Sequence, residues 1–170
     1  MYTFDNARRE ITFDRYNTPT PWMNYLSNGV FHTMISHCGG GVAFYKSPQI
    51  WRINHYRFFH LPTDRSGFYT YIRDGKDVWT PTNEPCPTKP EQWRSTHGMG
   101  YTRFEARRGG LRAEATYFVG RYENCLIWNL KLRADTDKHI TLFPYVELGM
   151  MEFIRELGWQ GYNQDQLSVS

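Results

Sequence analysis

Apolar and polar residues alternate most regularly in the second half of the chain. Between residues 111 and 119, one face would carry Leu111, Ala113, Ala115 and Tyr117, and the other Arg112, Glu114 and Thr116. A period of two residues is typical of a strand that is buried on one side only. The pattern therefore predicts a strand over 111–119. Arg108-Gly109-Gly110 would form a hairpin turn joining it to a preceding strand over 101–106.

Similar patterns predict further strands on both sides of this hairpin. Residues 68–73 are aromatic and β-branched and end at the turn dipeptide Asp74-Gly75. Residues 126–133 alternate again, and a polar turn over 135–138 leads into an apolar segment over 140–148. Several short strands joined by turns at this spacing favour an all-β fold, a large antiparallel β-sandwich.

The remaining segments are less regular. Pro19 and Pro21 precede an apolar segment over 22–26, and residues 80–90 hold four prolines, which predicts a long irregular loop. A short helix is expected near 150–157. The alternation over 167–170 is that of a strand just beginning, so we expect residues 1–170 to form one β-sandwich domain that is incomplete at its C-terminal end.

Composition places the protein among soluble globular domains. The chain has 170 residues, of which 40% are hydrophobic, so it can bury a core. A net charge of +3 argues against nucleic acid as a partner, and the short basic runs at Arg8-Arg9 and 107–112 favour solvated strand edges and a turn. Three cysteines without C-x-x-C spacing favour a reducing compartment, and no stretch resembles a signal peptide or membrane span. We therefore expect a cytoplasmic protein that has no membrane partner.

Metal, phosphate and nucleophile motifs are weak. The pairs His32/His37 and His55/His60 are five residues apart, which is not the spacing of a helical metal pair, so a zinc site that includes Cys38 is disfavoured against ordinary hydrogen-bonded histidines. Gly39-Gly40-Gly41 lacks the Lys-Ser/Thr of a phosphate loop and favours a tight turn. No Gly-x-Ser-x-Gly segment supports a nucleophilic hydrolase.

Carboxylates and a polar aromatic loop leave a role with sugars open. Glu147 with Glu152, or Asp74 with Asp77, could form a glycosidase pair, although Asp beside a turn usually serves turn geometry. Residues 159–164 combine aromatic rings, which stack on sugar faces, with amides, which pair with hydroxyls. Sugar contact and an ordinary polar loop stay equally open for this segment.

Read in order, several segments resemble the cellobiose phosphorylase family (glycoside hydrolase family 94). The similarity covers essentially the whole chain and depends on the order and spacing of the motifs rather than on any one of them. They are Tyr2-Thr3-Phe4-Asp5 with Arg9-Glu10, and Thr18-Pro19-Thr20-Pro21-Trp22-Met23-Asn24-Tyr25-Leu26; Gly40-Gly41-Val42-Ala43-Phe44-Tyr45-Lys46, Arg52-Ile53-Asn54-His55-Tyr56-Arg57 and Leu61-Pro62-Thr63-Asp64; residues 69–79 with Thr80-Pro81, and His97-Gly98-Met99-Gly100-Tyr101-Thr102-Arg103; and Thr116-Tyr117-Phe118-Val119, Glu123-Asn124 and Tyr145-Val146-Glu147.

The resemblance implies the N-terminal β-sandwich of a cytosolic, usually homodimeric enzyme. Such enzymes are glycosyltransferase-type phosphorylases that cleave a β-linked disaccharide with inorganic phosphate and invert the anomeric centre. They need no metal or other cofactor, and phosphate is the co-substrate and nucleophile, so one carboxylic acid suffices to protonate the leaving oxygen. In the family, that acid and the phosphate site belong to an (α/α)6 barrel. We therefore expect the barrel, the catalytic acid and the phosphate site to lie outside these 170 residues and the chain alone to be inactive.

Two residues carry over from the family as substrate-binding candidates. A Tyr-Gln-Arg-Asn-Leu stretch of cellobiose phosphorylases contacts the acceptor sugar through its Gln and Arg. Here, residues 163–167 occupy that place, so Gln164 matches the Gln and Asp165 stands where the Arg would be. Exchanging a cation with five donors for an anion changes what the acceptor subsite recognises, which leaves cellobiose, cellobionic acid or a modified glucose open as substrates.

Two functions of other classes stay open beside that of a phosphorylase domain. A free-standing carbohydrate-binding module would bind cello-oligosaccharides saturably without phosphorolysis. A structural domain would contribute to dimerisation through exposed aromatic surface and the proline-rich loop over 80–90.

Overall fold

The computed structural model describes residues 2–56 and 66–149, and within these ranges every regular element is a β-strand. The all-β prediction is confirmed. The expected helix near 150–157 lies outside the described residues. Among the described residues, no helix is long and apolar enough to cross a membrane.

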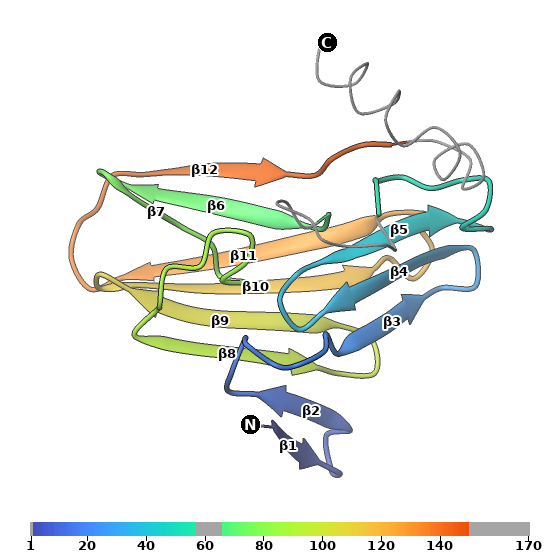
Figure 1. Cartoon of the computed structure of the whole chain (residues 1–170), viewed down its shortest axis with the longest axis horizontal. Coiled ribbons are helices and arrows are strands. Elements are labelled where there is room, and N and C mark those ends of the chain that lie inside the picture. Colours follow the sequence, from blue (N-terminus) through green and yellow to red (C-terminus); the bar gives the residue numbers. More distant parts are fainter. Residues whose placement is uncertain (1, 57–65, 150–170) are drawn as a thin grey trace.

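In the described part of the chain, twelve strands form three antiparallel sheets, which are shown in Figure 1. A six-stranded sheet has the order β1-β2-β8-β9-β10-β11, and two three-stranded sheets have the orders β12-β6-β7 and β3-β4-β5. The strands are β1 Tyr2–Asp5, β2 Glu10–Phe13, β3 Met23–Ser27, β4 Phe31–Ser36, β5 Gly41–Tyr45, β6 Tyr69–Asp74, β7 Asp77–Trp79, β8 Gln92–His97, β9 Thr102–Arg108, β10 Leu111–Val119, β11 Leu126–Ala134 and β12 Ile140–Tyr145.

The β9–β10 hairpin forms as its sequence predicts. Arg108 pairs with Leu111, so the loop is the two residues Gly109 and Gly110, both with positive φ (57° and 74°). Two left-handed residues in a two-residue loop match the twist of the strands that it joins, and glycine adopts this conformation without a steric penalty. Along β10, Leu111, Ala113 and the two alternate residues beyond them are buried, as the alternation indicated.

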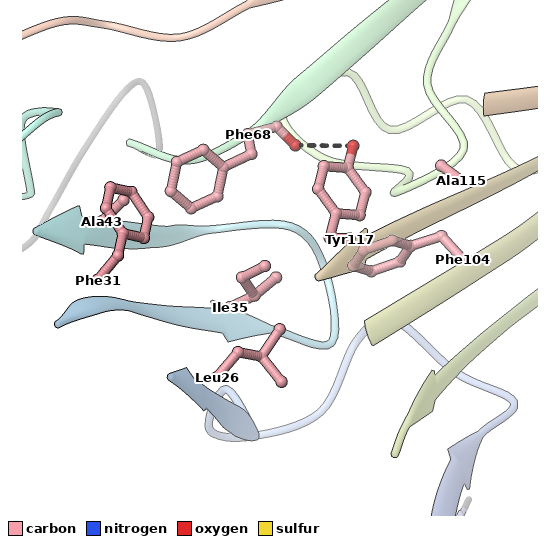
Figure 2. Packing of buried hydrophobic residues seen from close by; sticks show 8 residues of the cluster. All are labelled: Leu26, Phe31, Ile35, Ala43, Phe68, Phe104, Ala115 and Tyr117. Atoms are coloured by element: carbon pink, nitrogen blue, oxygen red, sulfur yellow. Dashed lines mark hydrogen bonds between the residues drawn. The ribbon is translucent and has the colours of Figure 1, made fainter. Parts of the chain in front are cut away.

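The core lies between the six-stranded sheet and the two smaller sheets, in two adjoining clusters. One half of β10 places Leu111 and Ala113 against Ile72 and Trp79 of the β12-β6-β7 sheet. The other half places Ala115 and Tyr117 against the β3-β4-β5 sheet. Figure 2 shows this second cluster, whose members are Leu26, Phe31, Ile35, Ala43, Phe68, Phe104, Ala115 and Tyr117.

Tyr117 adds a polar contact to this core. Its hydroxyl donates to the backbone carbonyl of Phe68 at 3.2 Å, the dashed line in Figure 2. Its ring packs edge-on against Phe104, with 5.6 Å between the centroids. Burial strongly raises the pKa of the hydroxyl, so it remains a donor. The contact ties the residue that precedes β6 to β10 of the six-stranded sheet.

The predicted loop over 80–90 packs against the sandwich at its beginning. Thr80, Thr82 and Asn83 are buried, and the indole nitrogen of Trp93 donates to the Pro81 carbonyl at 3.0 Å. Thr82 also donates its hydroxyl hydrogen to the Glu84 carbonyl at 2.7 Å. These contacts make the first part of the loop a cover for the core rather than an open recognition loop.

Candidate functional site

Both substrate-binding candidates, Gln164 and Asp165, lie outside the described residues, as do Glu152, His60 and the polar loop over 159–164. The structure does describe the segment that leads toward them. Leu148 forms an isolated antiparallel bridge with Asn54. His55 donates its backbone N–H to the Glu147 carbonyl at 2.9 Å, and Gly149 donates to the Ile53 carbonyl at 3.0 Å. Residues 147–149 are thus attached to residues 53–55.

Asn54 holds residues 53–55 on the β3-β4-β5 sheet. Its side chain is fully buried, and its Oδ1 accepts the backbone N–H of Ala43 at 2.8 Å. Its Nδ2 lies 3.0 Å from the carbonyl oxygens of both Gly41 and His55. An amide that satisfies three buried backbone groups makes the attachment point rigid. The chain that continues toward residues 164 and 165 therefore leaves a fixed place on the sandwich.

Two buried histidines hold the peptide units around Trp22. Trp22 donates its backbone N–H to His37 Nδ1 at 3.2 Å, and its carbonyl accepts from the backbone N–H of His37 at 2.9 Å. The Nε2 of His97 also lies 3.1 Å from that carbonyl, and its Nδ1 lies 3.1 Å from the Thr102 hydroxyl. A carbonyl only accepts, so the Nε2 of His97 carries the hydrogen and its Nδ1 is the acceptor.

This network explains the state of His97 and disfavours a metal there. Burial, with a smaller contribution from the neighbouring His37, lowers the pKa of His97 to about 4 although the hydrogen bond to the Trp22 carbonyl raises it, so the ring is neutral near pH 7. The Nε2 of His37 faces the Tyr16 carbonyl and the Thr18 hydroxyl, so both nitrogens of this ring are engaged as well. Within residues 2–56 and 66–149, no three His, Cys, Asp or Glu side chains gather as metal ligands.

Asp74 and Asp77, the candidate glycosidase pair, have structural roles in ion pairs. Asp77 accepts a two-pronged contact from Arg108, at 2.6 and 2.9 Å, and this guanidinium lowers the pKa of the carboxyl. Asp74 accepts from the Lys138 ammonium at 2.5 Å. Each carboxylate thus ties the β6–β7 turn to another element, as turn geometry suggested. Because Glu152 is not described, the alternative pair with Glu147 is not tested.

The three glycines over 39–41 form a tight turn. A Cβ on Gly41 would lie 1.9 Å from the Met34 carbonyl oxygen, and one on Gly39 would lie 2.6 Å from the Thr82 side chain. Gly39 also has a positive φ of 86°. The turn from β4 to β5 therefore needs these glycines for close backbone packing, which is the reading that the sequence favoured.

The basic run over 107–112 is divided between two roles. Arg108 pairs with Asp77, whereas Arg107 and Arg112 face each other across the β9–β10 ladder on the solvent side of the six-stranded sheet. Arg133 of β11 continues the same row, opposite Arg112. The sequence favoured solvated strand edges and a turn for residues 107–112 and did not reveal this row of arginines. The alternation in the predicted strands over 111–119 and 126–133 could have revealed it, because it assigns Arg112 and Arg133 to solvent-facing positions.

Comparison with known proteins settles the family. Residues 9–164 match the sequence model of "Glycosyl hydrolase 94, supersandwich domain". The chain belongs to this family. The resemblance in the sequence motifs is thereby confirmed, and the all-β sandwich described above agrees with a supersandwich domain.

Three relatives of this supersandwich domain are glycoside phosphorylases. This chain is 35% identical over 150 residues to the N,N'-diacetylchitobiose phosphorylase of Vibrio proteolyticus. The aligned region covers 85% of this chain and 19% of that protein. The same values hold for the N,N'-diacetylchitobiose phosphorylase of Vibrio furnissii. It is 29% identical over 164 residues to the solabiose phosphorylase of Paenibacillus borealis, covering 94% of this chain and 21% of the relative. The chain thus spans about a fifth of the length of these relatives.

Proposed function

We propose that this supersandwich domain is the N-terminal part of a longer inverting glycoside phosphorylase. The match over residues 9–164 carries the proposal, because the relatives that share this domain are named as phosphorylases. The longer protein would transfer a glycosyl group from a β-linked disaccharide to inorganic phosphate, giving a sugar 1-phosphate and the acceptor sugar. It would use no metal or other cofactor, and it would act in the cytoplasm as a homodimer.

In this proposal, residues 1–170 supply no catalytic group. The catalytic acid and the phosphate site would belong to an (α/α)6 barrel elsewhere in the longer protein. The sandwich would contribute to the acceptor subsite through Gln164 and Asp165. The attachment of residues 147–149 to Asn54 supports this role, because it gives the segment toward these residues a rigid starting point.

The substrate is the open part of the proposal. N,N'-Diacetylchitobiose is a candidate substrate because two relatives are named as its phosphorylases. Cellobiose and cellobionic acid are candidates because of the family resemblance. Asp165 stands where the family has an arginine, and its carboxylate can only accept hydrogen bonds. It therefore favours acceptor sugars that offer hydroxyl or amide hydrogen-bond donors at that subsite.

Phosphorolysis by the longer protein tests the proposal. The longer protein should be incubated with phosphate and each of the three disaccharides, and the products followed by NMR. We expect an α-anomeric sugar 1-phosphate from one β-linked disaccharide, and no turnover by the 170-residue chain alone. Hydrolysis to two free sugars, or phosphorolysis by the 170-residue chain, would contradict it. Saturable binding of cello-oligosaccharides to a longer protein without phosphorolysis would favour a carbohydrate-binding module instead.

The acceptor role of Gln164 has a separate test in the same protein. Gln164→Ala should raise KM for the acceptor sugar in the synthetic direction by about tenfold, because one or two hydrogen bonds to the sugar are lost. KM for the sugar 1-phosphate should stay unchanged. Gln166→Ala, two residues away, is the matched control. An equal effect of both variants on both substrates would indicate a structural role for the segment.

A further inference from the structure

The solvent-facing side of the six-stranded sheet carries charged side chains in ordered cross-strand rows. Arg107 of β9 is in register with Arg112 of β10, which is in register with Arg133 of β11. We call these three residues the arginine row. Neighbouring partners in a sheet have Cβ atoms about 5 Å apart, so the three arginine side chains start side by side across three strands.

A second row lies beside the arginine row, one step along the same strands. Glu105 and Glu114 are paired in its centre, Arg94 of β8 pairs with Glu105, and Lys131 of β11 pairs with Glu114. We call these four residues the mixed row. The two rows line a depression of about 690 Å³. The depression is open to solvent on one side, and its lining is mainly polar.

The ion pairs of this face leave part of the arginine row without a partner. Arg107 lies 2.8 Å from Asp135 and 3.5 Å from Glu91. In contrast, within the described ranges no carboxylate lies within 4.0 Å of Arg112 or Arg133, although these two exposed residues are directly opposite each other. Like charges in directly opposite positions destabilise a sheet. An anion between the two guanidinium groups would remove that repulsion.

The mixed row would make the surface selective among anions. Glu114 lies 3.1 Å from Lys131, and Glu105 lies 3.7 Å from Arg103, so each carboxylate lies beside the arginine row with a cation near it. Two carboxylates there would repel a continuous phosphate backbone such as that of a nucleic acid. They would accept hydrogen bonds from hydroxyl groups, which a sugar ring offers in numbers.

We propose that this depression binds a monosaccharide that carries one anionic group. Arg112 and Arg133 take the anion in charge-assisted hydrogen bonds, and Glu105 and Glu114 accept hydrogen bonds from the ring hydroxyls. A phosphate ester or a uronic carboxylate supplies the same chemistry at the arginine row. The proposed site is made of residues other than Gln164 and Asp165 and does not depend on the proposed catalysis, because binding to this chain is measured without turnover.

Calorimetric titration of the 170-residue chain tests the site. The probes are glucose 1-phosphate, glucuronate, glucose and inorganic phosphate, at low and at physiological salt. We expect saturable binding of glucose 1-phosphate or glucuronate, with whichever binds more tightly identifying the anionic group. Glucose and inorganic phosphate should bind at least tenfold more weakly, because each satisfies one row only. Binding should weaken as salt rises, since the guanidinium groups are exposed.

Charge-matched variants locate the site. Arg112→Gln/Arg133→Gln should weaken binding by about a hundredfold, at roughly tenfold for each lost charge-assisted hydrogen bond. Arg121→Gln/Lys46→Gln removes two exposed positive charges from loops outside both rows and should leave binding within twofold. Thermal unfolding followed by circular dichroism checks that each variant is folded. The proposal would be overturned by an equal loss of affinity in both double variants. It would also be overturned by equal affinity for inorganic phosphate and glucose 1-phosphate, or by no saturable binding of either anionic sugar.

Discussion

At the scale of single residues, the state of His97 makes a simple prediction about pH. The buried ring has a pKa of about 4, against 6.5 for an ordinary histidine, because burial disfavours the charged form. Above pH 6.5 the ring is neutral in both the folded and the unfolded chain, and its titration has no effect on stability. Between pH 6.5 and 4 only the unfolded chain takes up the proton. The folded state should therefore lose up to about 3 kcal/mol as the pH falls through this window.

Urea unfolding at pH 7.5, 5.5 and 4 measures this loss. Carboxylates also titrate toward the acidic end, so the comparison uses variants. His97→Asn should reduce the fall in unfolding free energy between pH 7.5 and 5.5, whereas His139→Asn, at an exposed position, should leave it unchanged. The interpretation of His97 is wrong if both variants show the same pH dependence as the parent chain.

Gly41 and Gly75 separate two reasons for a glycine in a turn. A Cβ at Gly41 would lie 1.9 Å from a backbone oxygen of β4, so Gly41→Ala must displace one strand from the other. At Gly75 nothing lies within 4 Å, but φ is +61°, so alanine there meets only local backbone strain. We expect Gly75→Ala to cost about 1 kcal/mol of unfolding free energy. Gly41→Ala should cost several kcal/mol, as expected for an overpacked core, or prevent folding. Thermal unfolding ranks the two variants, and equal costs would contradict the clash.

At the scale of elements, the Asp77–Arg108 ion pair joins the β6–β7 turn to the end of β9. Its two contacts of 2.6 and 2.9 Å have fork geometry, and its side chains are 42% and 28% exposed. The Glu114–Lys131 pair has one contact of 3.1 Å, and its lysine is 65% exposed. Fork geometry and partial burial strengthen an ion pair, whereas a single contact in water contributes little.

Double-mutant cycles compare these two pairs. We expect a coupling energy of about 1 kcal/mol for Asp77→Asn with Arg108→Gln. For Glu114→Gln with Lys131→Gln the coupling should be below about 0.5 kcal/mol. The coupling comes from urea unfolding of the single and double variants at low salt. A larger coupling for the Glu114 pair would show that geometry does not control the strength of these bridges.

The strands β6, β10 and β11 could be predicted because alternating or aromatic and β-branched side chains mark them in the sequence. Residues 111–119 were delimited without error, and the strands predicted over 68–73 and 126–133 are displaced or shortened by one residue. The strands that the sequence did not predict lack that signal. β1 is exposed on both faces, and β8 (Gln92–His97) has Ser95, Thr96 and His97 buried as polar residues. Such residues are accepted in a core through partners that are distant in sequence, which no local pattern reveals.

The candidate site was predictable only in part, for the same reason. The structural roles of the glycines and aspartates in the turns were predicted correctly, because the residue types that a turn requires depend on the neighbouring sequence alone. The network of His37, His97 and Trp22 joins residues up to 75 positions apart, and the sequence indicated no more than hydrogen-bonded histidines. The arginine row likewise depends on the register of three strands. Gln164 and Asp165 stay a prediction from the family resemblance.

At the scale of the whole molecule, burial falls from β10 toward the edge strands of the sheets, β11, β1 and β12. In β10 every second residue from Leu111 to Tyr117 is at most 4% exposed. In β11 the core-facing side chains, such as Trp128 and Leu130, are only partly buried. In β1 all four residues are exposed, and β12 carries Phe143 and Tyr145 at 47% and 44% exposure. Stability should therefore be distributed unevenly across the described sandwich.

Amide hydrogen exchange measures that distribution. The amides of β9 and β10 bond within the sheet and cover the two core clusters, so they should exchange only through global unfolding. The amides of β1 should exchange by local fraying, because this edge strand has one partner and no buried side chain. We expect protection at least a hundredfold greater in peptides from 102–119 than in peptides from 2–5, with β12 between them. Uniform protection would mean that the strands unfold as one unit, and that the burial of β9 and β10 does not set their local stability.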